Sequence, residues 1–98
     1  MAVPLRQLEV DRVMNMARAF GWDLVKQEFD VDVTKIALSF PIAQLTKQEA
    51  EMEMQRMLNV ARTLGWEELT REFQATQMLL VLQKPAPAAE AAGLEIPT

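Results

Sequence analysis

The chain has 98 residues, of which 50% are hydrophobic and 24% are charged, and its formal net charge is −4. This length and balance are typical of one globular domain. The absence of cysteine and histidine excludes disulfides, thiolate metal sites and nucleophile–histidine catalysis. The acidic excess argues against bulk binding of nucleic acid but leaves room for a local basic patch. No stretch approaches the ~18 apolar residues of a membrane span, and the N-terminus lacks a signal-peptide pattern, so we expect a cytoplasmic protein.

The first predicted element is a helix over about residues 5–20. Its apolar residues recur at spacings of three and four, as in a helix with one buried side: Val10, Val13, Met14, Ala17 and Phe20. Gly21 suits the left-handed residue that ends many helices, and Trp22 follows where such ends make a hydrophobic contact with the last turns. The same pair recurs as Gly65 and Trp66. We therefore interpret both tryptophans as packing residues, with exposed binding hot spots as the alternative.

Two strands are predicted after this helix, over about residues 23–29 and 33–40. In the first stretch, Val25, Phe29 and Val31 lie on one face at period two. Trp22, Val25 and Phe29 also fit a helical spacing, so a helix is the alternative for residues 23–29 and for the matching 67–73. The second strand alternates more clearly, and Pro41 ends it. Its apolar face consists of Ile36, Leu38 and Phe40.

The second half of the chain repeats this order. Residues 9–41 and 53–85 align without a gap and are identical at 11 of 33 positions, where ordinary residue frequencies give roughly two. A helix over about residues 47–64 begins after Thr46, which forms a predicted capping box with Glu49. Strands follow over about 67–73 and 77–84, and Pro85 ends the last one. Residues 79–82 are apolar on both faces, which predicts a central strand or an interface.

These elements predict an α+β fold built from a duplicated helix–strand–strand unit. The two units, about 5–41 and 47–85, share one domain over residues 1–84, since two units are too few for a solenoid. Four antiparallel strands with both helices on one face make a two-layer sandwich in the order αββαββ. Residues 85–98 form an Ala/Pro-rich tail, which we consider as a docking peptide anchored by Leu94 and Ile96.

Each predicted helix carries the run Glu-x-x-Arg-x-x-Asn-x-x-Arg, starting at Glu9 and at Glu53. We interpret these positions as a polar ribbon opposite the apolar stripe. One hypothesis is a site for an anion or an acidic partner. The alternative is a solvated face with ion pairs worth about 0.2–0.5 kcal/mol each. The candidate binding residues are Arg12, Asn15, Arg18, Arg56, Asn59 and Arg62.

Two further patterns have structural interpretations. Asp30-x-Asp32-x-Thr34 resembles the aspartate motif of haloacid-dehalogenase-type phosphatases, but those enzymes need a larger α/β body, and we interpret it as a polar turn between strands. The methionines at Met14, Met54 and Met57 fall on the apolar stripes and predict core packing, although thioethers can also bind Cu(I). Met16 and Met52 fall beside the stripes and are candidates for a partner surface.

We expect a small non-enzymatic protein–protein interaction module, without a cofactor or metal, that acts as a homo-oligomer or an accessory subunit. The expected interface contains Leu79 and Val81, with Met16 and Met52 as further candidates, because a small chain gains stability by pairing its sheet edges or faces. The alternative is a regulator that binds nucleic acid or a small anion through the helix arginines. A carboxylate-based enzyme is a third hypothesis, for which the sequence singles out no pair of acids.

Overall fold

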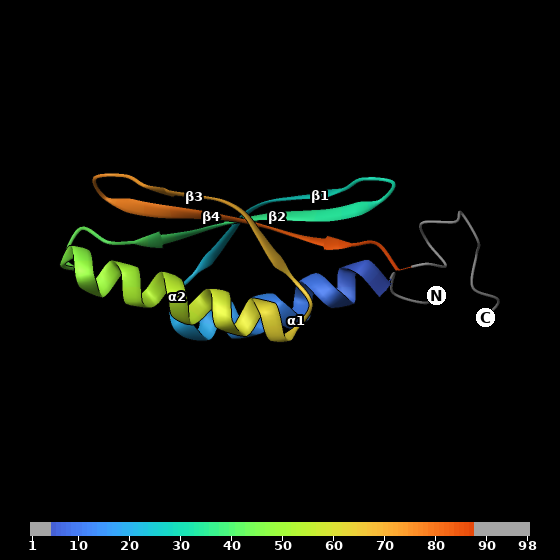
Figure 1. Ribbon diagram of the computed structural model, residues 1–98, viewed down its shortest axis with the longest axis horizontal. Coiled ribbons are helices and arrows are strands. Elements are labelled where there is room, and N and C mark those ends of the chain that lie inside the picture. The colour runs from blue at the N-terminus through green and yellow to red at the C-terminus, as the bar shows by residue number, and fades with distance from the viewer. Residues whose placement is uncertain (1–4, 88–98) are drawn as a thin grey trace.

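The computed structural model describes residues 5–87, in which two helices pack against one side of a single sheet (Figure 1). This is the predicted α+β arrangement, with helices and strands in the predicted order. Residues 23–29 and 67–73 are strands rather than helices. The proposed tail anchors, Leu94 and Ile96, lie outside the described residues. The elements are α1 (Leu5–Phe20), β1 (Asp23–Phe29), β2 (Val33–Pro41), α2 (Lys47–Thr63), β3 (Glu67–Phe73) and β4 (Gln77–Pro85).

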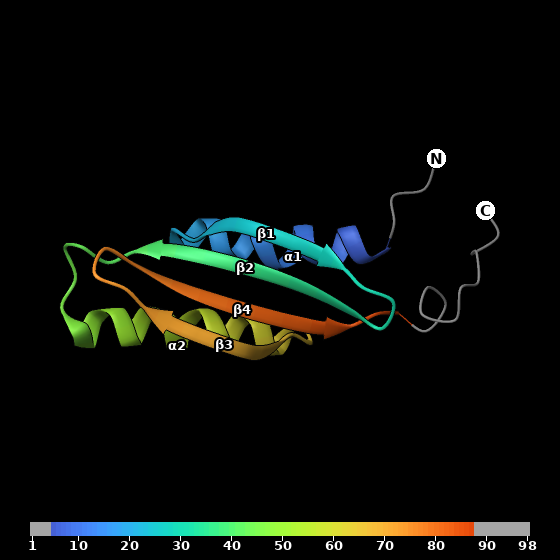
Figure 2. The same ribbon diagram turned by 90° about the horizontal axis from the view of Figure 1, so that it is seen from above.

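All neighbouring strands are antiparallel, and their order across the sheet is β1-β2-β4-β3 (Figure 2). The central pairing joins β2 to β4 and places Ala37 opposite Val81. These residues are 44 positions apart, which is the spacing between matching positions of the two halves. The two α-β-β units therefore meet at this pair, and each contributes one central strand and one edge strand.

Each edge strand contains a shift in its pairing, at Val25 in β1 and at Leu69 in β3. Such a bulge adds one residue to the strand and changes which side chains face the core beyond it. Val25 is 59% exposed and Val31 is 75% exposed. The prediction that Val25, Phe29 and Val31 share one face of a regular strand is therefore wrong, because the bulge interrupts the alternation at Val25 and Val31 lies in the turn beyond the end of β1.

The core lies between the two helices and the inner face of the sheet. Both helices contribute the residues that the three-and-four spacing predicts, and the central strands contribute alternate residues. Partly buried rings of Phe20 and Phe40 pack against its edge. The fully buried members are Val10, Val13, Met14, Ala17, Trp22, Ile36, Leu38, Ala50, Met54, Met57, Leu58, Ala61, Trp66, Met78, Leu80 and Leu82.

Both helices end where the glycines predict. Gly21 has a φ of +100° and Gly65 a φ of +88°, in the left-handed region that disfavours other residues. After α1, the Trp22 amide donates a hydrogen bond to the carbonyl of Ala17 at 2.9 Å, and the chain after α2 makes the same bond from Trp66. This Schellman-type ending turns each indole back under its helix.

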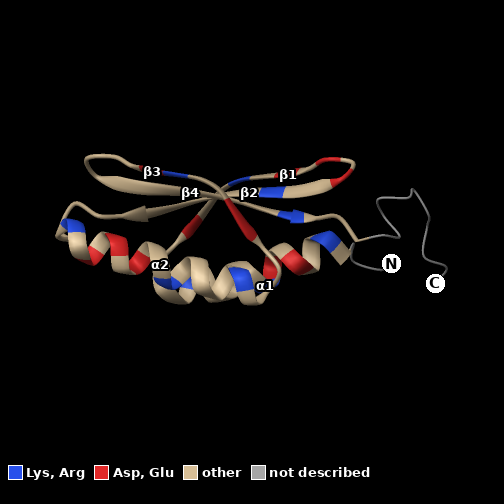
Figure 3. Ribbon diagram, viewed as in Figure 1, with Lys and Arg blue, Asp and Glu red and all other residues tan. Residues whose placement is uncertain are grey.

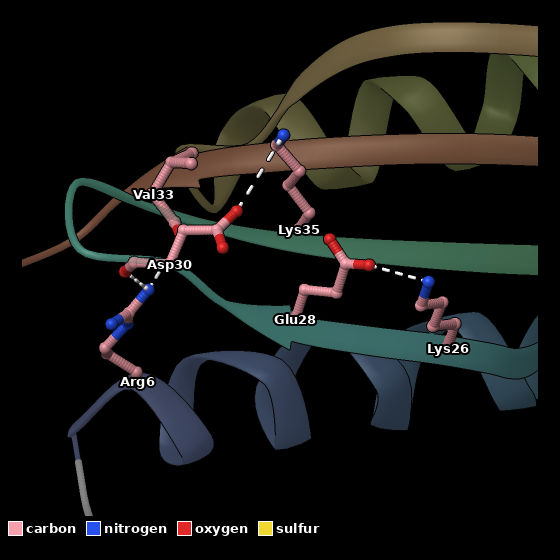
Figure 4. Close-up of polar contacts among 6 residues, drawn as sticks. All are labelled: Arg6, Lys26, Glu28, Asp30, Val33 and Lys35. Carbon is pink, nitrogen blue, oxygen red and sulfur yellow. Dashed lines mark hydrogen bonds and ion pairs between the residues drawn. The ribbon is translucent and has the colours of Figure 1, made fainter.

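The first hairpin is held to α1 by Arg6, which the sequence analysis did not single out (Figure 4). The Arg6 guanidinium donates hydrogen bonds to the carbonyls of Asp30 and Val33, both at 2.6 Å, and to the hydroxyl of Thr34 at 2.8 Å. It also lies 5.3 Å from the ring centre of Phe29. The Asp30-x-Asp32-x-Thr34 motif is thus a turn between β1 and β2 whose buried hydroxyl is satisfied by arginine.

Candidate functional site

The sheet face that points away from the helices, called here the outer face, has no layer over it within residues 5–87 (Figures 1 and 2). Side chains alternate along a strand, so each strand contributes to both faces. In β4, alternate residues from Met78 to Leu82 are buried, whereas Leu79 and Val81 on the outer face are only half-buried. Ala37 pairs with Val81 and shares this face. The centre of the outer face is therefore apolar.

The edge strands surround this apolar centre with charged residues. Residues directly opposite each other across antiparallel strands lie on the same face, so pairing partners show which edge residues belong to the outer face. Two lysines belong to it, Lys26 on the edge strand β1 and Lys35 on the neighbouring central strand β2. Four carboxylates belong to it as well: Asp23, Glu28, Glu67 and Glu72. The outer face thus has an apolar centre and a rim with more acidic than basic groups.

Two exposed ion pairs lie at the β1–β2 end of this face (Figure 4). The Lys26 ammonium is 2.7 Å from the Glu28 carboxylate, and the Lys35 ammonium is 3.8 Å from Asp30. The hydrogen bond between Lys26 and Glu28 raises the pKa of the lysine and lowers the pKa of the glutamate from their ordinary values. Between them and Val81 lies a shallow depression of about 150 Å³. Both pairs face water, so a partner could exchange them for its own charged groups.

The candidate residues of the arginine runs are all exposed, but they do not form one straight ribbon. Because a helix has about 3.6 residues per turn, the step of nine positions from Glu9 to Arg18 makes about two and a half turns and ends on the opposite side of α1. In α2, Arg56 lies 3.9 Å from the ring centre of Phe20 and 3.8 Å from Glu53. In α2 the acidic residues lie in the first half of the helix, before both Arg56 and Arg62 (Figure 3).

The remaining polar candidates of the runs lie apart from these contacts. Asn59 accepts a hydrogen bond from Gln55 at 2.9 Å, one turn earlier on α2. Asn15, Arg18 and Arg62 are exposed.

The tryptophans and methionines divide between core and surface. Trp22 is 1% exposed and Trp66 is 2% exposed, so neither indole is accessible as a surface hot spot, and the packing interpretation is the one that fits. The methionines of the apolar stripes are buried, whereas Met16 is 42% and Met52 is 64% exposed on the helices. Those two side chains lie on the opposite layer from Leu79 and Val81, so the four candidate interface residues do not form one surface.

A pocket of about 430 Å³ lies between α1, the end of α2 and the end of β4. It contains an ion pair that sequence reasoning missed, in which the Lys84 ammonium is 2.5 Å from Glu9. The only sequence signal was a difference between the halves, since Leu64 and Lys84 occupy the positions that match Phe20 and Phe40. The pocket is lined by Leu5, Leu8, Glu9, Arg12, Leu64 and Lys84.

Within the described part of the chain, no group of three or more acidic, histidine or cysteine side chains is arranged to hold a metal ion. Neither helix of residues 5–87 combines the length and apolar character needed to cross a membrane. Comparison with protein-family models, with curated proteins and with solved structures found no match.

Proposed function

We propose that this chain is a cytoplasmic, non-enzymatic protein–protein interaction module that docks through its outer sheet face, either on a second copy or as an accessory subunit of a larger assembly. The observation that carries the proposal is the apolar centre formed by Ala37, Leu79 and Val81 on a sheet that residues 5–87 cover on one side only. Antiparallel sheets tolerate one solvated face, but that face is then usually polar.

The irregular edge strands of the sheet support docking through the outer face rather than the addition of a further strand at an edge. A regular edge strand offers unpaired backbone groups to another chain, and bulges are one way in which proteins prevent this. Both edge strands contain such a bulge, at Val25 and at Leu69. The pairing of a further strand along β1 or β3 would be interrupted at these positions, which leaves the face as the favoured surface.

The test compares Val81→Glu with Val31→Glu in the full chain. Val81 lies at the centre of the outer face, whereas Val31 is 75% exposed in a turn, so the same substitution there is a matched control. We expect Val81→Glu to reduce self-association in sedimentation velocity, or co-purification of a stoichiometric partner, at least tenfold, and Val31→Glu to leave both unchanged. Circular dichroism checks that each variant remains folded.

Salt dependence distinguishes the two forms of the proposal. Two copies would bring acidic rims together, so added salt should strengthen a homo-oligomer, whereas it should weaken binding to a partner with a basic rim. The proposal is contradicted if the wild-type chain is a monomer without a stoichiometric partner and Val81→Glu behaves in the same way.

A further inference from the structure

The two helices end against the sheet in different ways, although the positions involved match between the two halves of the sequence. Where α1 ends, the ring of Phe20 lies beneath the guanidinium of Arg56, whose central carbon is 3.9 Å from the ring centre. The ring of Phe40 lies beside it against Trp22, with 5.1 Å between ring centres. Both phenylalanines pack against the core. Aromatic rings therefore fill this end of the helix–sheet interface.

The matching residues where α2 ends are Leu64, Lys84 and Arg12, each 44 positions away from Phe20, Phe40 and Arg56. Here the pocket of about 430 Å³ is open, with Leu5 and Leu8 on its α1 side. Within residues 5–87, Arg12 has no ring beneath it and makes no hydrogen bond or ion pair. At the end of α2 there is thus an open space at the position where the ring of Phe20 lies at the end of α1.

Glu9 gives this space a polar wall. One carboxylate oxygen of Glu9 pairs with the Lys84 ammonium at 2.5 Å, and the ammonium also donates to the carbonyl of Leu64 at 2.9 Å. The other carboxylate oxygen, Oε1, is buried and accepts no hydrogen bond from any group of residues 5–87. A buried acceptor without a donor is costly, so a ligand that brings a donor to Glu9 gains more than it would at an exposed carboxylate.

We propose that this pocket binds a planar aromatic ring that carries an N–H or O–H donor on its edge. The ring stacks under the guanidinium of Arg12, as Phe20 does under Arg56, and its donor binds Glu9 Oε1. Arginine stacks well on aromatic faces, and the pocket volume falls within the range of about 300–1,000 Å³ that is usual for small-molecule sites. The pocket lies on the helix side of the sheet, so this proposal does not depend on docking at the outer face.

The test is a titration of the isotope-labelled full chain with indole, followed by amide chemical shifts. We expect saturable shifts at Leu8, Arg12 and Leu64, with half-saturation below about 1 mM. 1-Methylindole keeps the ring but lacks the N–H donor, and it should bind about tenfold more weakly because hydrogen bonds to charged groups are worth roughly this factor or more. Equal binding of the two compounds would contradict the role of Glu9.

Two variants place the binding at this pocket. Leu64→Phe supplies the ring from the chain itself, as in the other half, and should abolish the shifts while the protein stays folded. Arg12→Gln should weaken indole binding severalfold, whereas Arg56→Gln, its counterpart, should leave the affinity unchanged. The proposal is overturned if indole does not saturate below about 1 mM, or if Leu64→Phe binds it as wild type does.

A second ligand identifies the source of the ring. The tripeptide Gly-Trp-Gly carries the same indole on a protein backbone. If it binds at least as tightly as indole, the pocket accepts an aromatic side chain of a partner protein. If indole binds and the tripeptide does not, the pocket takes a free small molecule. Both results retain the aromatic site.

Discussion

At the scale of single residues, the two helix-ending glycines have different surroundings. A Cβ atom on Gly21 would lie 3.2 Å from the ring carbon Cε2 of Phe40, which is packed against the core. A Cβ atom on Gly65 would lie 3.2 Å from Cε of Lys84, near the end of a flexible side chain. Both glycines have positive φ, so the backbone cost of a larger residue is shared, but the steric cost is not.

We therefore predict that Gly21→Ala lowers the free energy of unfolding by more than Gly65→Ala does. Each substitution should cost about 1–2 kcal/mol for the left-handed backbone, and Gly21→Ala should cost more because the ring of Phe40 must move. Urea denaturation measures both. Gly65→Asn is the control, since asparagine tolerates this conformation better and should lose less than alanine. Equal stability of Gly21→Ala and wild type would contradict the strain.

At the scale of elements, α2 begins with the predicted capping box. The Thr46 amide donates to the Glu49 carboxylate at 2.9 Å, and the Glu49 amide donates to the Thr46 hydroxyl at 3.1 Å. The backbone hydrogen bond from Thr46, followed by the contribution of its side chain, lowers the pKa of Glu49 below the ordinary 4.5. Each group thus satisfies a donor that the first helical turn would otherwise leave free.

This interaction makes part of the stability depend on pH. Because the pKa of Glu49 is lower in the folded chain than in the unfolded chain, its contribution is complete above the unfolded pKa near 4.5 and is lost as the pH falls through the folded pKa. We predict that the difference in urea midpoint between wild type and Glu49→Gln is largest near neutral pH and shrinks below pH 4.5. Thr46→Ala removes the hydroxyl but keeps the backbone amide that donates to the Glu49 carboxylate, so it should retain most of the same pH dependence. A difference that stays constant across this range would be the contrary result.

The elements were predictable where their signals are local. Gly21, Thr46 and the three-and-four spacing of apolar residues lie within a few positions of the helix ends that they define. The bulge at Val25 was not predictable, because it depends on how β1 pairs with β2 and leaves no local pattern. Arg6 was missed for a similar reason, since its hydroxyl partner, Thr34, lies 28 residues away.

The same distinction applies to the candidate sites. Leu79 and Val81 were expected at a surface because an apolar run on both faces of a strand is visible in the sequence. The acidic rim was not visible, since only the strand pairings assign Glu28 and Glu72 to that face. The Glu9–Lys84 pair joins the first helix to the last strand, and no spacing rule reaches across such a distance.

At the scale of the whole molecule, the two units share one core and one sheet. Trp22 and Trp66 are buried in the same cluster, and β2 pairs with β4 along its full length. Each unit pairs its central strand along one edge only, and the other edge of that strand pairs with the central strand of the other unit. We therefore expect the units to gain and lose their structure together.

Each unit contains one tryptophan, which allows a direct measurement of this coupling. In Trp22→Phe, fluorescence reports on the second unit, and in Trp66→Phe it reports on the first. We predict that the urea transition of each variant has the same midpoint by fluorescence as by far-ultraviolet circular dichroism. Two separate midpoints within one variant would show that the units unfold independently.

The central pairing of Ala37 with Val81 has a consequence for the covalent chain. The segment between Pro41 and Lys47 connects two pieces that already hold each other through strand hydrogen bonds and a common interior. A cut in that connector would leave a non-covalent complex of two fragments, and fragments made separately would reassociate. Either fragment alone would carry an open central strand, whose best available substitute for the missing half is another copy of itself.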